Sequence, residues 1–126
     1  MNTVYSYKNL DKSEESKFFE YFETKIKAIK NLLKNYSEDS IILKANIEKF
    51  EKHDAFEVEL TLTLPSVSII AKEASHQITK AVDLSKDRLI LQIKKHTAML
   101  RKERTHQSIK EKIGAHVEVS EVEKIN

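Results

Sequence analysis

The side chains best suited to binding a ligand lie late in the sequence, between Lys86 and Arg104. This segment contains seven Lys or Arg residues and two acids, Asp87 and Glu103, so its local charge is +5 in a chain whose net charge is only +2. Clustered ammonium and guanidinium groups attract phosphate groups, and such clusters are typical of proteins that bind nucleic acid. The segment therefore predicts contact with an anionic partner.

Patterns for catalysis or metal binding are absent from the sequence. No two of the five histidines are four residues apart, as helical metal ligands are, and no HExxH motif occurs. Without cysteine there is no disulfide, thiolate metal site or cysteine nucleophile. A single glycine excludes a glycine-rich phosphate-binding loop. We therefore expect a protein that is not an enzyme and that uses no metal and no cofactor.

Asp83 and Asp87 form a carboxylate pair that could support acid–base chemistry, because they lie one turn apart on a predicted helix. Three basic residues lie close to them in the sequence: Lys80, Lys86 and Arg88. We interpret the two acids as members of ion pairs within that helix and not as catalytic groups.

A long helix must position the basic residues, because an apolar stripe with helical period runs through the same segment. At 100° per residue, the members of this stripe fall within about 40° of one line. They are Ile78, Val82, Ser85, Leu89, Ile93, His96 and Leu100. Basic residues fall on roughly the opposite side, and they are Lys80, Arg88, Lys94, Lys95, Arg101 and Lys102. One side of the helix is predicted to pack, and the other to meet the anionic partner.

Before this helix, the sequence predicts one more helix and four strands. Five apolar residues from Phe18 to Leu33 recur at steps of three or four, which indicates a helical core stripe. Asp11 and Glu14 have the spacing of a capping box at its start. Alternation of apolar and polar residues indicates strands. In order, the predicted elements are a strand at 3–7, a helix from Asp11 to about Tyr36, strands at 41–50, 56–64 and 67–71, and the long helix.

The order β-α-β-β-β-α predicts an α+β fold, with an antiparallel-rich four-stranded sheet and two helices packed on one face. A chain of 126 residues suits one domain. We place it at residues 1–113, with a C-terminal tail at 114–126, since Gly114 is where a helix commonly ends. No apolar run approaches the ~18 residues needed to span a membrane, so we expect a soluble cytoplasmic protein.

The string AVDLSKDRLILQIKKH, which follows AKEAS, resembles the second helix of the ribosome hibernation-promoting factors, also called ribosome-associated translation inhibitors. In that family the helix carries AIDL, then DKL, then QLRKY. Here residues 81–84 match AIDL, residues 87–89 match DKL, and residues 92–96 match QLRKY. The likeness covers both core and charged positions, and it keeps its order across about residues 3–104.

The resemblance implies a short-form hibernation factor. Such a protein is non-catalytic and binds the small ribosomal subunit between head and body, where it occupies the path of messenger and transfer RNA. It keeps idle ribosomes inactive under stress, and basic residues of both helices contact ribosomal RNA. The positions carried over are Lys25, Lys86, Arg88, Lys94, Lys95, Arg101 and Lys102. Off the ribosome we expect a monomer, with no membrane partner and no small-molecule substrate.

Two other interpretations of the basic side stay open. A Lys/Arg face on a helix is often only a solvated surface. Leu84 and Leu91 also fall on this side, and Leu91 stands where many members of the family have a basic residue. Two exposed leucines there indicate deeper packing of that face or a protein contact. The alternative function is therefore a protein-interaction module of the same fold that uses Leu84 and Leu91 without binding ribosomal RNA directly.

Overall fold

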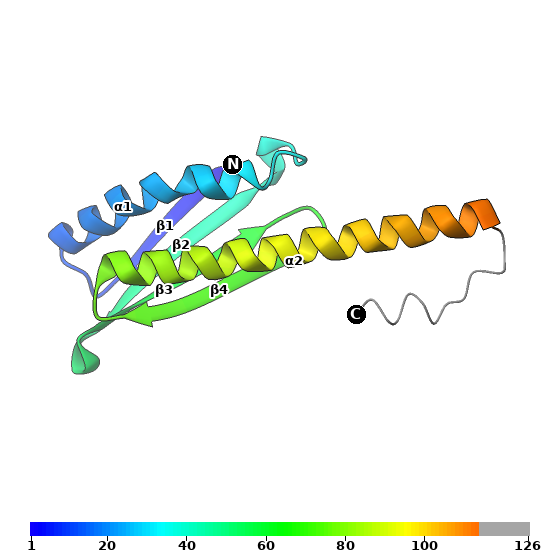
Figure 1. Cartoon of the computed structure of the whole chain (residues 1–126). Helices are drawn as coiled ribbons and strands as arrows, with labels where there is room; N and C mark the ends of the chain where they lie inside the picture. The colour runs from blue at the N-terminus through cyan, green and yellow to red at the C-terminus, as the bar shows by residue number, and fades with distance from the viewer. Residues whose placement is uncertain (114–126) are drawn as a thin grey trace. The chain divides into compact units, whose positions relative to one another are not determined.

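The computed structural model describes the backbone of residues 1–113 and the side chains of residues 1–101, so the predicted tail at 114–126 lies outside the described residues. The elements follow the predicted order (Figure 1). They are β1 (Asn2–Lys8), α1 (Lys12–Asn31), the 3-10 turn η1 (Glu38–Ser40), β2 (Ile42–Phe50), the 3-10 turn η2 (Glu51–His53), β3 (Ala55–Thr63), β4 (Ser68–Ser75) and α2 (Ile78–Ile113). Residues 1–92 form one compact unit, and the residues from Ile93 onward belong to a second.

The four strands form one mixed sheet in the order β1-β2-β3-β4. β1 runs parallel to β2, with Tyr5 opposite Ala45, whereas β3 is antiparallel to both β2 and β4. A parallel pair needs a long crossover connection, which α1 supplies between β1 and β2. A tight turn joins β3 to β4, where the Leu64 N–H donates to the Val67 carbonyl at 2.8 Å. The predicted α+β class is confirmed.

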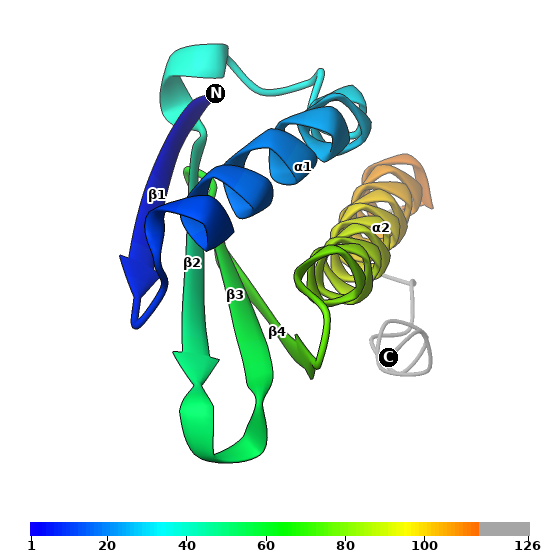
Figure 2. The same cartoon turned by 90° about the vertical axis from the view of Figure 1, so that its left-hand side faces the viewer.

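The core of residues 1–92 lies between the sheet and the two helices. Figure 2 shows α1 and the first part of α2 on the same side of the sheet. Alternate strand residues face that side, and Leu43 and Leu60 among them are fully buried. Phe18 and Phe22 of α1 are also fully buried, and their rings meet the Tyr5 ring of β1 edge-on. Within this unit, both helices cover one face of the sheet, as predicted.

α1 ends at Asn31, so the prediction that it continues to about Tyr36 is wrong. Beyond Asn31, the N–H groups of Leu32 and Leu33 bond to carbonyls three residues back, and Tyr36 bonds to Leu33 in the same way. Such bonds tighten the chain into turns in place of the α-helical ladder. Leu33 is still buried, with 3 % of its surface exposed. The apolar spacing that predicted α1 therefore continues beyond the last residue of the helix.

β4 continues to Ser75 and α2 begins at Ile78, whereas we predicted a strand that ends at Ala71 with the helix directly after it. The additional residues stay extended because they pair with β3, up to Ser75 opposite Phe56. Pairing with a neighbouring strand overrides the helical preference of Ala, Lys and Glu. The segment AKEAS is therefore the end of a strand and not the start of the helix.

The predicted capping box at the start of α1 is present. The Asp11 carboxylate accepts from the Glu14 N–H at 2.7 Å, and the Glu14 carboxylate accepts from the Asp11 N–H at 3.0 Å. We expect Asp11→Ala to lower the free energy of unfolding by about 1 kcal/mol, because a helix N–H loses its partner. Urea unfolding followed by circular dichroism measures this loss. The control is Asp39→Ala, since the exposed Asp39 carboxylate makes no bond to any described residue; equal losses would contradict the capping role.

Candidate nucleic-acid interface

The predicted RNA-contacting residues all lie on the two helices, but they fall into two groups. Lys25 is on α1, and Lys86 and Arg88 are on α2, all within the compact unit of residues 1–92. The other group lies on α2 beyond Gln92 and consists of Lys94, Lys95, Arg101 and Lys102. Lys94 and Lys95 differ from the first group in how their charges are paired.

Lys25 belongs to a cluster that joins α1 to α2. Its ammonium lies 3.5 Å from a carboxylate oxygen of Asp83 and 4.6 Å from the centre of the Tyr21 ring. The Tyr21 hydroxyl donates to the same carboxylate, 2.9 and 2.8 Å from its two oxygens. Hydrogen bonding with Tyr21 and the negative charge of Asp83 raise the pKa of Lys25, although desolvation acts against them. Lys25 therefore stays charged, and its charge is paired with an acid of the same compact unit.

Ion pairs also hold Lys86 and Arg88. Lys86 lies 2.7 Å from its neighbour Asp87, with 19 % of the Lys86 side chain exposed, and Arg88 pairs with Glu73 of β4. We expected Asp83 and Asp87 to pair within their own helix; this is confirmed for Asp87 and wrong for Asp83, whose partner is on α1. Each predicted contact within residues 1–92 is therefore matched by an acid of the same unit.

Lys94 and Lys95 are more available than the three paired residues. Lys94 and Lys95 are exposed, and neither has an ion-pair partner among the described residues. Arg101 is exposed too, and the described side chains end before Lys102. The exposure of Lys94, Lys95 and Arg101 confirms the expectation that they lie away from the apolar stripe of the helix. Lys94 and Lys95 are the predicted contacts best able to meet an anion from solution.

Two exposed lysines were left out of the predicted site, Lys27 on α1 and Lys80 on α2. Each lies opposite the buried stripe of its helix, and neither pairs with an acid in the part of the chain whose side chains are described. Helical spacing placed Lys80 on the basic side of its helix, but the family resemblance did not carry it over to the site. The positive charge of Lys27 interacts favourably with the negative end of the α1 helix dipole. The sequence therefore gives no separate reason to assign this charge to binding. Nothing in the sequence marks Tyr21 as the partner of Asp83, because 62 residues separate them.

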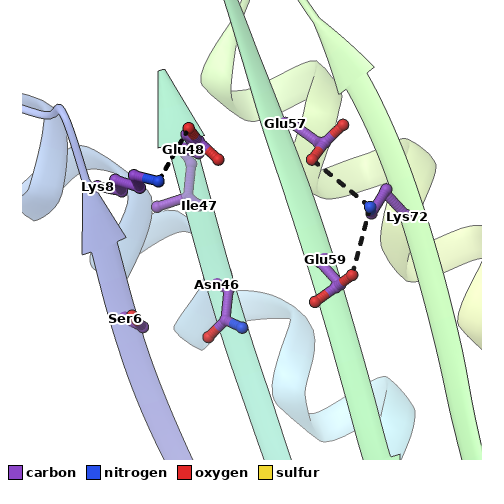
Figure 3. Close-up of a pocket in the computed structure, with 8 residues that line it drawn as sticks. All are labelled: Ser6, Lys8, Asn46, Ile47, Glu48, Glu57, Glu59 and Lys72. Carbon is purple, nitrogen blue, oxygen red and sulfur yellow. Dashed lines mark ion pairs between the residues drawn. The ribbon is translucent and has the colours of Figure 1, made fainter. Parts of the chain in front are cut away.

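The open face of the sheet carries both lysines and carboxylates. A hollow of about 280 Å³ on this face is lined by residues that include Lys8, Glu48, Glu57, Glu59 and Lys72 (Figure 3). Lys8 lies 3.6 Å from Glu48, and Lys72 lies 3.8 Å from Glu57 and 3.5 Å from Glu59. Two lysines against three carboxylates leave this hollow without excess positive charge. It is therefore unsuited to a polyanion, in contrast to the helices.

The chemistry that the described residues offer is electrostatic. Among them, no three His, Asp or Glu side chains are grouped so that they could hold a metal ion. In the same part of the chain, no helix combines the length and the apolar character that crossing a membrane requires. Lysine supplies a point charge and arginine a planar fork of donors, and both suit phosphate. The exposed lysines of the helices therefore have the chemistry that a contact with phosphate requires.

Comparison with known proteins places these features in context. The family model described as Sigma 54 modulation protein / S30EA ribosomal protein matches residues 3–101. A solved structure of a ribosomal subunit interface protein from Coxiella burnetii is similar, with 23% identity and a TM-score of 0.58, over 78% of this chain and 99% of that one. The N-terminal domain of Protein Y from Thermus thermophilus is also similar, with 22% identity and a TM-score of 0.58, over 76% and 99%. A search of curated proteins found no match. The two structures show a shared fold.

Proposed function

The chain belongs to the Sigma 54 modulation protein / S30EA ribosomal protein family, and from that premise we propose that it binds the small ribosomal subunit, occupies the channel of messenger and transfer RNA, and keeps idle ribosomes inactive. The family match confirms the resemblance to hibernation-promoting factors that the α2 sequence indicated. The protein acts in the cytoplasm by binding alone, without catalysis and without a cofactor, and it is a monomer off the ribosome.

The observation that carries this proposal is the exposure of Lys94 and Lys95, which have no acidic partner among the described residues. Phosphate contacts fix the position of a protein on nucleic acid without reading its sequence, so a compact unit with a basic helix has the chemistry that an RNA-walled channel requires. The description of the Coxiella burnetii neighbour as a ribosomal subunit interface protein supports this location.

The seven predicted contacts do not contribute equally under this proposal. Lys94 and Lys95 supply more of the affinity than the paired residues, because a paired cation must share or release its carboxylate before it binds phosphate. The paired residues are Lys25, Lys86 and Arg88. Arg101 and Lys102 are the remaining proposed contacts, on the part of α2 beyond Gln92.

We expect the protein to sediment with small ribosomal subunits at low salt and to leave them as salt rises. Each phosphate contact releases condensed counterions, so roughly six contacts give a slope of log K against log[salt] of roughly −4 to −5. Sucrose-gradient sedimentation of purified small subunits at several KCl concentrations measures the slope. Large subunits run in parallel are the control for non-specific RNA binding. A slope near zero would contradict an RNA-backbone contact.

Leu84 and Leu91 favour the second candidate function, a protein-interaction module of the same fold. Their exposed fractions are 38 % and 57 %, which confirms that both lie on the surface of α2. When an apolar partner removes exposed apolar side chains from water, the free energy of the system falls, which favours binding. A contact of this kind hardly depends on salt. The salt series therefore also separates the two candidates, since only the RNA contact weakens steeply.

A further inference from the structure

We propose that Tyr21 and Lys25 form a subsite for a phosphate group of RNA, and that the Asp83 carboxylate occupies this subsite in the free protein. Asp83 thereby lowers the affinity for RNA and keeps the complex readily reversible. The inference rests on the proposed function, because it assigns a regulating residue to one of the proposed contacts, Lys25.

The first argument is the arrangement of donors. Two side chains of α1, one with a hydroxyl and one with an ammonium, are directed at a single carboxylate of α2. The Tyr21 hydroxyl lies 2.9 and 2.8 Å from the two oxygens, and the Lys25 ammonium lies 3.5 Å from one of them. Phosphate oxygens accept hydrogen bonds from the same two kinds of donor. The Asp83 carboxylate therefore stands where a phosphate could be bound.

The second argument is access. The cluster lies at the surface of the unit, with 27 % of the Lys25 side chain and 42 % of the Asp83 side chain exposed. Part of the Lys25 side chain is therefore open to a phosphate group from solution. Ion pairs at a protein surface contribute little to stability. Exchange of the carboxylate for a phosphate at Lys25 therefore costs little folding stability. A charged Asp83 beside the phosphate still opposes this exchange by electrostatic repulsion.

The other paired cations lack this arrangement. Lys86 meets Asp87, and Arg88 meets Glu73, and among the described residues no uncharged hydroxyl joins either pair. Neutralising one of those acids would release a single cation. Neutralising Asp83 would open a subsite with two kinds of donor, which is why this acid has the larger influence on binding.

Asp83→Asn tests the inference, because it removes the charge that opposes a phosphate and keeps the side-chain size. A neutral amide accepts a weaker hydrogen bond than a carboxylate, so a phosphate can displace it from Tyr21. The matched control is Glu20→Gln, which makes the same change of net charge on the exposed side of α1, where Glu20 pairs with no described residue. Affinity is measured across a salt series with two probes, purified small ribosomal subunits and a short RNA duplex of fixed sequence. Asp83→Ala is the second variant if Asp83→Asn melts well below the parent.

We expect Asp83→Asn to bind both probes roughly fivefold more tightly, as the loss of one repulsion at contact distance predicts. The salt slope should become steeper by roughly 0.7 to 0.9, because Lys25 gains a full phosphate contact. Glu20→Gln should differ from the parent by less than about twofold, since salt screens charges that are not in contact. Adding Lys25→Gln to Asp83→Asn should abolish the gain, as a double-mutant cycle requires for residues that act together.

Several results would overturn the inference: no gain in Asp83→Asn, no binding of either probe by any variant, an equal gain in Glu20→Gln, or a gain that survives Lys25→Gln. Failure of the proposed function has a different signature. If the parent does not bind small subunits, but Asp83→Asn gains affinity for the RNA duplex through Lys25, the phosphate subsite is real and the ribosomal role is wrong.

Discussion

Replacing Lys94, Lys95 and Arg101 by glutamate should leave the protein folded and remove it from the small ribosomal subunit. All three side chains are exposed, and surface substitutions usually change stability by about 0.5 kcal/mol or less. Binding should fall steeply, because a charge contact at 4 Å in water is worth about 1 kcal/mol and each replacement turns an attraction into a repulsion. We expect a loss of affinity of roughly a thousandfold or more. Co-sedimentation and repression of a cell-free translation assay measure it, with circular dichroism as the test of folding.

The control for this triple variant changes the same net charge on other surfaces. Lys12, Lys44 and Lys52 are exposed, and no described acid pairs with them. Their replacement by glutamate should retain most of the binding, with a small loss from screened long-range charge. An equal loss in both variants would mean that net charge alone governs binding. Full binding by the variant on α2 would mean that its basic side is only a solvated surface.

Phe22→Ala should lower the free energy of unfolding by about 3 to 5 kcal/mol, the largest stability loss we expect from a single core substitution. The Phe22 ring is fully buried, stacks on Phe18 at 5.7 Å between centroids, and meets the Tyr5 ring at 5.9 Å. Alanine removes the ring and leaves a cavity between α1 and the sheet. Since 1 kcal/mol shifts the melting temperature of a small domain by about 4–8 °C, thermal unfolding should detect the change easily.

Phe19→Ala is the matched control for Phe22→Ala, because it removes the same side chain three residues earlier on the same helix. Phe19 also contacts Tyr5, at 4.9 Å between ring centroids, but 42 % of its surface is exposed. We expect its loss to cost about 1 kcal/mol, since water can fill the space that the ring leaves. Similar losses for the two variants would contradict the placement of the core.

The features that the sequence determined by itself are those with a local period. Phe18, Phe22 and Ile29 are buried on α1, and alternate residues of β3 are buried on the sheet, because the side that a residue occupies depends only on its spacing within one element. Ser85 shows how strong this constraint is. It lies on the predicted stripe of α2 and is fully buried, and its hydroxyl is satisfied by donating to the Val82 carbonyl at 3.0 Å.

The family was accessible from the sequence for the same reason. The motif from Ala81 to His96 combines core and charged positions on one helix, so its pattern is complete within a short stretch of chain. The exposure of Lys94, Lys95 and Leu91 also follows from position on that helix, without knowledge of any other element.

Tertiary structure decided where β4 ends and which charges are paired across elements. β4 extends to Ser75 because it pairs with β3, and nothing in the sequence of residues 72–75 predicts that pairing. Asp83 faces Tyr21, 62 residues away in the chain, and Glu73 meets Arg88 across 15 residues, only because the helices and the sheet pack together. Electrostatic interaction depends on distance through space, whereas periodicity describes one element at a time. Spacing in the sequence could therefore place the basic residues on a surface, but it could not tell which of their charges are already matched.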